Sequence, residues 1–124
     1  MSKRILIIED QEDNRAIMRD ILSSAGYALV EAIDGEEGVK LARSERPDLI
    51  LMDIQLPTLD GYEATRQIRA IDELKSIPII AVTSYALSGD EARARSAGCD
   101  TYVAKPFSPR ELLAKVRKFL PNNG

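Results

Sequence analysis

Residues 48–57 read Asp-Leu-Ile-Leu-Met-Asp-Ile-Gln-Leu-Pro, and the rest of the chain is organised around them. The unbroken apolar run at residues 49–52 is typical of a strand that is covered on both faces. It ends on one carboxylate, Asp53. Because a buried carboxylate is costly without partners, Asp53 is expected to face a cation, a hydrogen-bond donor or a reaction. From this stretch alone, it is equally plausible that Asp53 has no functional partner and simply begins a turn before Pro57.

Apolar strands and amphipathic helices alternate along the rest of the chain. Their short connections predict an α/β fold in which helices cover both sides of a parallel, doubly wound five-stranded sheet with five helices. Strands are expected at residues 5–8, 28–32, 49–52, 77–82 and 101–104, and helices at about 12–25, 35–45, 62–71, 88–98 and 108–120.

Two of these helices carry a clear apolar face. The first is expected to bury Ile17, Ile21, Leu22 and Ala25 and to end at Gly26. The last begins with a serine, a proline and a capping glutamate, and its expected apolar face consists of Leu112, Leu113, Val116, Phe119 and Leu120.

Composition narrows the class of protein. The 124 residues fit one domain, residues 1–124, and 17 basic against 20 acidic residues give a net charge of -3, with no basic surface for nucleic acid. No apolar run is long enough for membrane insertion or a signal peptide, so a cytoplasmic protein is expected. Cys99 is the one cysteine and histidine is absent, which excludes an internal disulfide and a Cys/His metal site.

Charged and hydroxyl side chains stand at the carboxyl ends of four predicted strands. In open parallel sheets the working residues gather at that edge. Three carboxylates there would repel one another by about 4 kcal/mol per pair at ~4 Å and an effective dielectric of ~20, so a cation is required. The all-oxygen set favours Mg²⁺, with Mn²⁺ possible. These residues are Glu9, Asp10, Asp53, Thr83 and Lys105.

This set suits phosphoryl transfer. An ordinary aspartate is ionised at neutral pH, so Asp53 can attack phosphorus without a base and carry the group as an acyl phosphate. Lys105 and the Thr83 hydroxyl can neutralise and position it. Each residue also has an ordinary explanation as a cap, a turn or a surface charge, and only their combination favours a site.

The chain resembles the response regulator receiver domains of the CheY-like superfamily. The likeness covers essentially all 124 residues, and within the family the single-domain regulators of cell division are the similar members. It implies a flavodoxin-like sheet in the order 2-1-3-4-5. It rests on residues 5–10, 48–57, 60–61, 81–84 and 104–106, with residues 89–91 and 98–99 for the single-domain type.

The resemblance also implies a role for each site residue. Asp53 would be the phosphoacceptor, Lys105 would contact the phosphoryl group, and the Lys105–Pro106 bond would be cis. Mg²⁺ would be bound directly by Asp10, Asp53 and the backbone carbonyl of Gln55, with Glu9 acting through water.

Further implications concern signalling. Thr83 and Tyr102 would form a switch, while Gln55 and Tyr85 would tune dephosphorylation. The phosphodonor would be a sensor histidine kinase or a histidine phosphotransfer protein, and a downstream protein would bind the face around residues 88–120. Such a protein takes part in its own phosphotransfer and dephosphorylation, and is not an enzyme that turns over external substrates.

Three alternatives remain open. A flavin-binding module would need a phosphate cradle after the first strand, where this chain has Glu9, Asp10, Glu12 and Asp13. An aspartyl phosphatase would want a general acid at the position of Gln55. The chain could also be a receiver from a larger hybrid kinase, or one that signals without phosphorylation, although Met1 before the first strand favours a complete chain.

Overall fold

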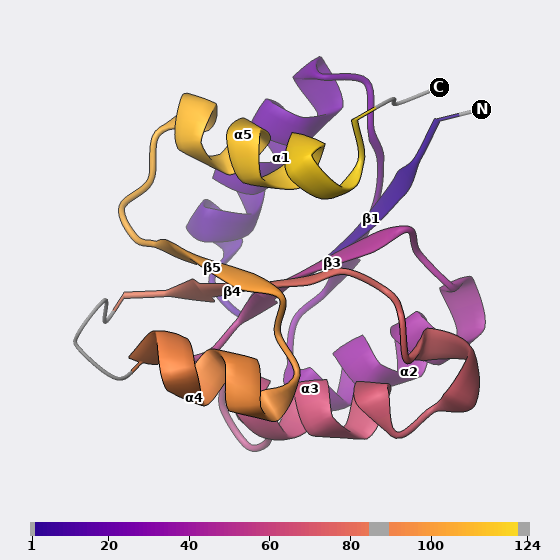
Figure 1. Cartoon of the computed structure of the whole chain (residues 1–124). Helices are drawn as coiled ribbons and strands as arrows, with labels where there is room; N and C mark the ends of the chain where they lie inside the picture. The colour runs from indigo at the N-terminus through magenta and orange to yellow at the C-terminus, as the bar shows by residue number, and fades with distance from the viewer. Residues whose placement is uncertain (1, 85–89, 122–124) are drawn as a thin grey trace.

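The computed structural model describes residues 2–84 and 90–121. Five parallel strands form one sheet in the order β2-β1-β3-β4-β5, which confirms the predicted architecture (Figure 1). The strands are β1 (Arg4–Ile8), β2 (Ala28–Ala32), β3 (Leu49–Asp53), β4 (Ile79–Thr83) and β5 (Thr101–Ala104).

Helices cover both faces of the sheet. Figure 1 shows α1 (Glu12–Ser24) and α5 (Pro109–Phe119) on one face. The opposite face carries α2 (Gly35–Glu45), α3 (Gly61–Arg69) and α4 (Asp90–Ala97). A short 3₁₀ helix, η1 (Asp72–Leu74), follows α3 and was not expected from the sequence.

The central strands supply the core in both directions. Ile5 and Ile7 of β1 pack on the α1 and α5 side, whereas Leu6 and Ile8 pack on the other. All four are fully buried. Successive side chains of a strand point to opposite faces, so a strand covered on both sides must be apolar throughout. Strand β3 follows the same rule and is buried up to its last residue, Asp53.

The predicted helix ends are largely confirmed. Gly26 has φ +94° after α1, and the Asp34 and Asp60 carboxylates accept from the backbone N–H three residues on. Ser108 and Glu111 cap each other at the start of α5. The cap expected at Ser88 lies outside the described residues.

Two expectations are wrong in detail. Ile17 does not belong to the buried face of α1: it is 51% exposed, and Met18 is buried in its place beside Leu22. The fourth strand begins at Ile79 instead of residue 77, because Pro78 has no N–H to donate to a neighbour, although its carbonyl accepts from Ile50.

Among the described residues, no helix is both long enough and apolar enough to span a membrane.

Candidate functional site

The ends of four strands bring the predicted site residues together. Ile8 lies opposite Met52 in the parallel register, so Glu9 and Asp53 follow at the same edge of the sheet. Asp53 in turn lies beside Val82, and Thr83 lies beside Ala104. The backbone N–H of Lys105 donates to the Thr83 carbonyl at 2.7 Å, which fixes the chain where β5 ends. Sheet register therefore assembles the site from distant segments.

A group of three carboxylates occupies this edge. Ligand oxygens of Glu9, Asp10 and Asp53 all lie within 4.8 Å of one another. Glu9 is fully buried and Asp53 is 3% exposed, whereas Asp10 is half-buried. The group is thus closed on the side of the core and open toward solvent at Asp10.

Lys105 supplies the positive charge of the site. Its Nζ atom lies 2.8 Å from Glu9 Oε1 and 3.3 Å from Asp53 Oδ2. Burial alone would lower the pKa of the Lys105 ammonium, but the Glu9 hydrogen bond and the charges of Asp53 and Glu9 outweigh it, so that pKa is raised. The lysine therefore stays charged beside both acids.

The Glu9 carboxyl has a raised pKa. Burial is the largest cause, and the neighbouring Asp53 adds to it, while the hydrogen bond from Lys105 opposes both. One lysine thus compensates only part of the cost of holding these acids together.

Two backbone N–H groups and the Arg15 side chain hold Glu9 and Asp53 in place. The N–H of Gln55 donates to Asp53 Oδ1 at 3.0 Å, and the N–H of Gln11 donates to Glu9 Oε2 at 3.1 Å. Arg15 Nη1 donates to the backbone carbonyl of Glu9 at 2.8 Å. These contacts fix the orientation of two carboxylates before any ligand binds.

The start of α3 packs closely against the end of β3. The N–H of Gly61 donates to the Ile54 carbonyl at 3.0 Å. A Cβ atom at Gly61 would lie 2.3 Å from the Asp53 carbonyl oxygen, so only glycine allows this approach.

The donor set suits a hard divalent cation. Carboxylate oxygens from Asp10 and Asp53, with a solvent-facing side for water, match the preference of Mg²⁺ for oxygen ligands and retained waters. Both Glu9 oxygens already accept hydrogen bonds, from Lys105 and from Gln11.

The remaining predicted residues lie nearby or outside the described chain. Thr83 is 5% exposed at the end of β4. Tyr102 is half-buried and packs against the core on the α4 side. The Lys105–Pro106 peptide bond is cis. Tyr85 lies outside the described residues.

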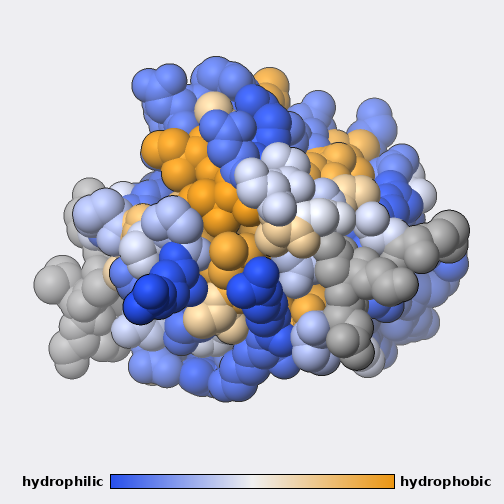
Figure 2. Space-filling view, turned by 90° about the horizontal axis from the view of Figure 1, so that it is seen from above, coloured by the Kyte–Doolittle hydropathy of each residue, from blue (hydrophilic) through white to orange (hydrophobic). Residues whose placement is uncertain are grey.

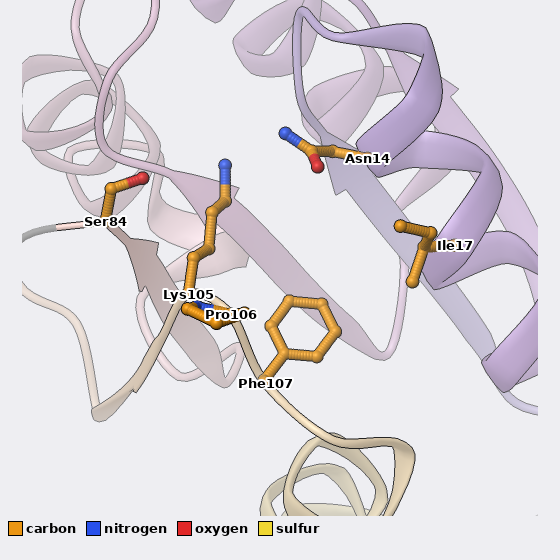
Figure 3. A pocket seen from close by; sticks show the side chains of 6 residues that line it. All are labelled: Asn14, Ile17, Ser84, Lys105, Pro106 and Phe107. Atoms are coloured by element: carbon orange, nitrogen blue, oxygen red, sulfur yellow. The ribbon is translucent and has the colours of Figure 1, made fainter.

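Sequence reasoning missed a pocket beside Lys105. Figure 3 shows its lining, which α1, the end of β4 and the segment after β5 provide. Asn14 lies three residues before Ile17 on α1, so the two side chains share one face of the helix. The lining residues are Asn14, Ile17, Ser84, Lys105, Pro106 and Phe107.

Apolar side chains also surface on the α1 and α5 side of the molecule. Figure 2 looks down on this side and shows an apolar band between hydrophilic surroundings. Exposed Ile17 and the partly buried Ile21, Phe107 and Leu113 belong to this side of the core.

Comparisons with known proteins agree on one family. Residues 5–117 match the family described as the response regulator receiver domain. The polar-differentiation response regulator DivK of Brucella anthropi is 44% identical over 120 residues, which cover 97% of this chain and 98% of that protein. The DivK of Brucella ovis is 42% identical over the same length.

Solved structures are similar over nearly the whole chain. The receiver domain of a sensor histidine kinase from Pseudomonas aeruginosa PAO1, with a magnesium ion coordinated in its active site cleft, has 40% identity and a TM-score of 0.91, covering 98% of this chain and 100% of that one. The chemotaxis protein CheY4 of Vibrio cholerae has 26% identity and a TM-score of 0.91, covering 96% and 99%.

Proposed function

The chain belongs to the response regulator receiver domain family, and from this we propose that Asp53 accepts the phosphoryl group of a two-component phosphorelay. The observation that carries the proposal is the contact of Lys105 with Asp53 inside the group of three carboxylates. Residues 1–124 would act as one receiver domain.

Asp53 is proposed as the nucleophile toward a phosphohistidine donor. One of its oxygens forms a bond to phosphorus, the phosphorus–nitrogen bond breaks, and the electron pair stays on the imidazole nitrogen. The Gln55 N–H holds Asp53 Oδ1 while Lys105 faces Oδ2, so the carboxylate is held in one orientation. Lys105 also lies where it can neutralise charge on the transferred group.

We propose that Asp10, Asp53 and the Gln55 backbone carbonyl hold Mg²⁺ directly, and that Mn²⁺ can replace it. Glu9 acts through water because both of its carboxylate oxygens are engaged within the protein. When bound, the ion screens the repulsion among the carboxylates and neutralises charge on the phosphoryl oxygens.

Thr83 and Tyr102 are proposed as the switch that reports phosphorylation. Alternate residues of a strand point to the same face of the sheet, so Thr83 lies on the face of Ile79 and Ala81, which pack on the α4 side. Tyr102 packs on that side too. A hydroxyl drawn toward an acyl phosphate at Asp53 would leave space on the side where the tyrosine ring lies.

The downstream partner is proposed to be a protein that binds the face around residues 88–120. A cavity of about 370 Å³ lies on this face between β5 and α5, and Tyr102 is among its walls. A turn of that ring would change the shape of the cavity, and so couple the site to the partner. The cavity is lined by Tyr102, Val103, Ala104, Glu111, Ala114 and Lys115.

The donor is proposed to be a sensor histidine kinase or a histidine phosphotransfer protein in the cytoplasm. Gln55 and Tyr85 would set how long the acyl phosphate lasts, so the only turnover is that of the protein's own phosphoryl group. Equal dephosphorylation rates in wild type and Tyr85→Ala would remove Tyr85 from this role.

Phosphotransfer is tested with a phosphorylated histidine kinase that carries a radioactive phosphoryl group. Wild type is expected to take up the label with Mg²⁺ or Mn²⁺ and to lose this ability in EDTA. Asp53→Asn should take up none. Asp20→Asn, a change at an exposed acid of α1, is the matched control and should label as wild type does. Labelling of Asp53→Asn at the wild-type level would contradict the proposal.

A further inference from the structure

Arg15 of α1 contacts the segment that carries Glu9 and Asp10, and each of its guanidinium nitrogens has a partner. Nη1 donates to the Glu9 backbone carbonyl at 2.8 Å, Nε lies 3.4 Å from Glu31 Oε1, and Nη2 pairs with Glu12. The Arg15 side chain is 12% exposed. A planar fork that is held at three points has one orientation, so its hydrogen bond to the Glu9 carbonyl is fixed in direction.

Strand β2 supports this arrangement. Both carboxylate oxygens of Glu31 accept from Arg19, each at 2.8 Å, so Glu31 is already held where it meets Arg15. The acids Glu12 and Glu31 also offset the positive charge of the Arg15 guanidinium. Arg15 therefore has little net charge to exert on the carboxylate group beside it, and its effect there is mainly geometric.

The Glu9 carbonyl lies where the pairing of β1 with β2 ends. The Glu9 N–H still donates to the Ala32 carbonyl at 3.0 Å, but Ala32 is the last residue of β2. The Glu9 carbonyl accepts instead from the Arg15 side chain. Arg15 thus continues the support that β2 gives to β1, and holds the peptide group that joins Glu9 to Asp10.

This peptide group sets the direction of Asp10. A peptide group is planar, so the Glu9 carbonyl oxygen lies in one plane with the N and Cα atoms of Asp10. The Asp10 side chain accepts from Gln11 Nε2 at 3.2 Å, at an exposed position. Glu9 and Asp53, in contrast, are buried. Asp10 therefore depends on its backbone for orientation more than the other two acids do.

We propose that Arg15 is a positioning residue for the Mg²⁺ site, and that it holds the Glu9–Asp10 peptide so that the Asp10 carboxylate faces the ion. The inference rests on the proposed function, in which Asp10 is a direct ligand. Arg15 contacts neither the ion nor the phosphoryl group in this role. Charge and geometry predict opposite effects of removing it: loss of a positive charge alone would strengthen cation binding, whereas loss of a positioning contact weakens it.

Mg²⁺ binding to the unphosphorylated protein, measured by isothermal titration calorimetry, tests which effect applies. Arg15→Ala is expected to weaken Mg²⁺ binding about three- to tenfold, the size of one lost hydrogen bond. Arg15→Lys keeps the charge but cannot make three contacts at once, so it should also weaken binding, by about twofold or more. Arg43→Ala removes an exposed positive charge from α2 and should bind within about twofold of wild type.

Two further measurements restrict the effect to the metal ligand. In EDTA, amide hydrogen exchange of residues 9–11 should be faster in Arg15→Ala, because the Glu9 carbonyl has lost its donor. At saturating Mg²⁺, labelling of Asp53 by acetyl phosphate should return to within about twofold of wild type, because the contact of Asp53 with Lys105 is unchanged. Urea denaturation in EDTA identifies any variant that does not fold.

The outcomes separate this inference from the proposed function. Tighter or unchanged Mg²⁺ binding by Arg15→Ala overturns the role of Arg15, and so does labelling that stays slow at saturating Mg²⁺. Wild-type affinity in Arg15→Lys also overturns it, and this variant decides if Arg15→Ala does not fold. In each case wild type still binds Mg²⁺ and is labelled at Asp53, so the proposed function stands. A wild type that neither binds Mg²⁺ nor takes up label overturns both.

Discussion

At the scale of single residues, the three clustered carboxylates of Glu9, Asp10 and Asp53 lower the stability of the folded protein. Glu9 and Asp53 are both buried, and Lys105 contacts both carboxylates. Such an arrangement is retained at functional sites although a less charged one would be more stable.

Removing one charge should stabilise the metal-free protein. Asp53→Asn keeps an oxygen for the Gln55 N–H and leaves Lys105 paired with Glu9, so repulsion falls while the hydrogen bond remains. The free energy of unfolding in EDTA is expected to rise by about 1 kcal/mol, measured by urea denaturation. Mg²⁺ should stabilise wild type more than the variant. A lower stability of Asp53→Asn in EDTA would contradict this view of the charges.

Thr58 adopts a strained backbone in the loop after Asp53. Its φ is +67°, and the N–H of Leu59 donates to the Pro57 carbonyl at 2.7 Å across it, which is a tight turn with Thr58 at its centre. A β-branched residue rarely occupies this region of backbone conformation.

Glycine at this position should relieve the strain. Thr58→Gly is expected to raise the free energy of unfolding by about 1 kcal/mol relative to Thr58→Ala, because alanine keeps the Cβ atom that makes positive φ unfavourable. Urea denaturation of both variants measures the difference. If Thr58→Ala is the more stable of the two, the turn is not strained in solution.

The sequence identified the charged site residues but not the pocket next to them. Strand ends select Glu9, Asp10, Asp53 and Lys105 because parallel strands deliver their last residues to one edge. Ile17 has the spacing of a core residue, and periodicity cannot reveal that the sheet does not cover its side of α1.

At the scale of elements, Arg69 ties the end of α3 to several segments. Its Nε atom donates to the Gly98 carbonyl at 2.9 Å, and Nη1 donates to the Ile77 carbonyl at 2.6 Å. Nη2 contacts Asp100 Oδ2 at 2.9 Å, and the same oxygen accepts from the Ile79 N–H at 2.8 Å. One side chain thus links α3, the end of α4 and the start of β4.

A lysine should not replace this arginine. Lys has no planar fork and cannot reach several carbonyls at once. Arg69→Lys is therefore expected to lower the free energy of unfolding by about 1–3 kcal/mol, since partly buried carbonyls lose their donor. Arg66→Lys on the same helix is the control, because the Arg66 side chain pairs with Glu63 at an exposed position. Equal effects of the two changes would contradict the linking role of Arg69.

Element boundaries were less predictable than element types. The apolar run at residues 77–82 signals a strand, but the ladder begins only after Pro78, which cannot donate to it. The 3₁₀ helix after α3 is three residues long and carries no periodic signal that separates it from a loop.

At the scale of the whole molecule, the fold follows from alternating apolar strands and amphipathic helices, and all five strands lie where the pattern indicates. Strand order does not follow from periodicity, because any order can bury the same strands. The order 2-1-3-4-5 came from the family resemblance.

The free energy of unfolding should depend on pH through the ion pair of Arg19 with Glu31. Arg19 Nε lies 2.8 Å from Glu31 Oε2, and this hydrogen bond holds the pKa of the Glu31 carboxyl below its usual range. A carboxyl with a lowered pKa stabilises the fold above its unfolded pKa, and that contribution is lost as pH falls through the folded value.

Glu31→Gln is accordingly expected to be less stable than wild type at pH 7. The gap in urea midpoint should close as pH is lowered below the ordinary carboxyl pKa of 4.5. Asp72→Asn, at an exposed pair with Lys75, should show a smaller gap at neutral pH. If the difference in urea midpoint between wild type and Glu31→Gln does not change with pH, the ion pair is not the cause of that difference.

The most direct test of the central claim locates the phosphoryl group. Wild type is phosphorylated by a histidine kinase with Mg²⁺, digested under mild conditions and mapped by mass spectrometry. The mass of one phosphoryl group should appear on the peptide that contains Asp53 and on no other peptide, and it should be absent from Asp53→Asn. A stable phosphoryl group on a peptide without Asp53, present in both proteins, would contradict the assignment.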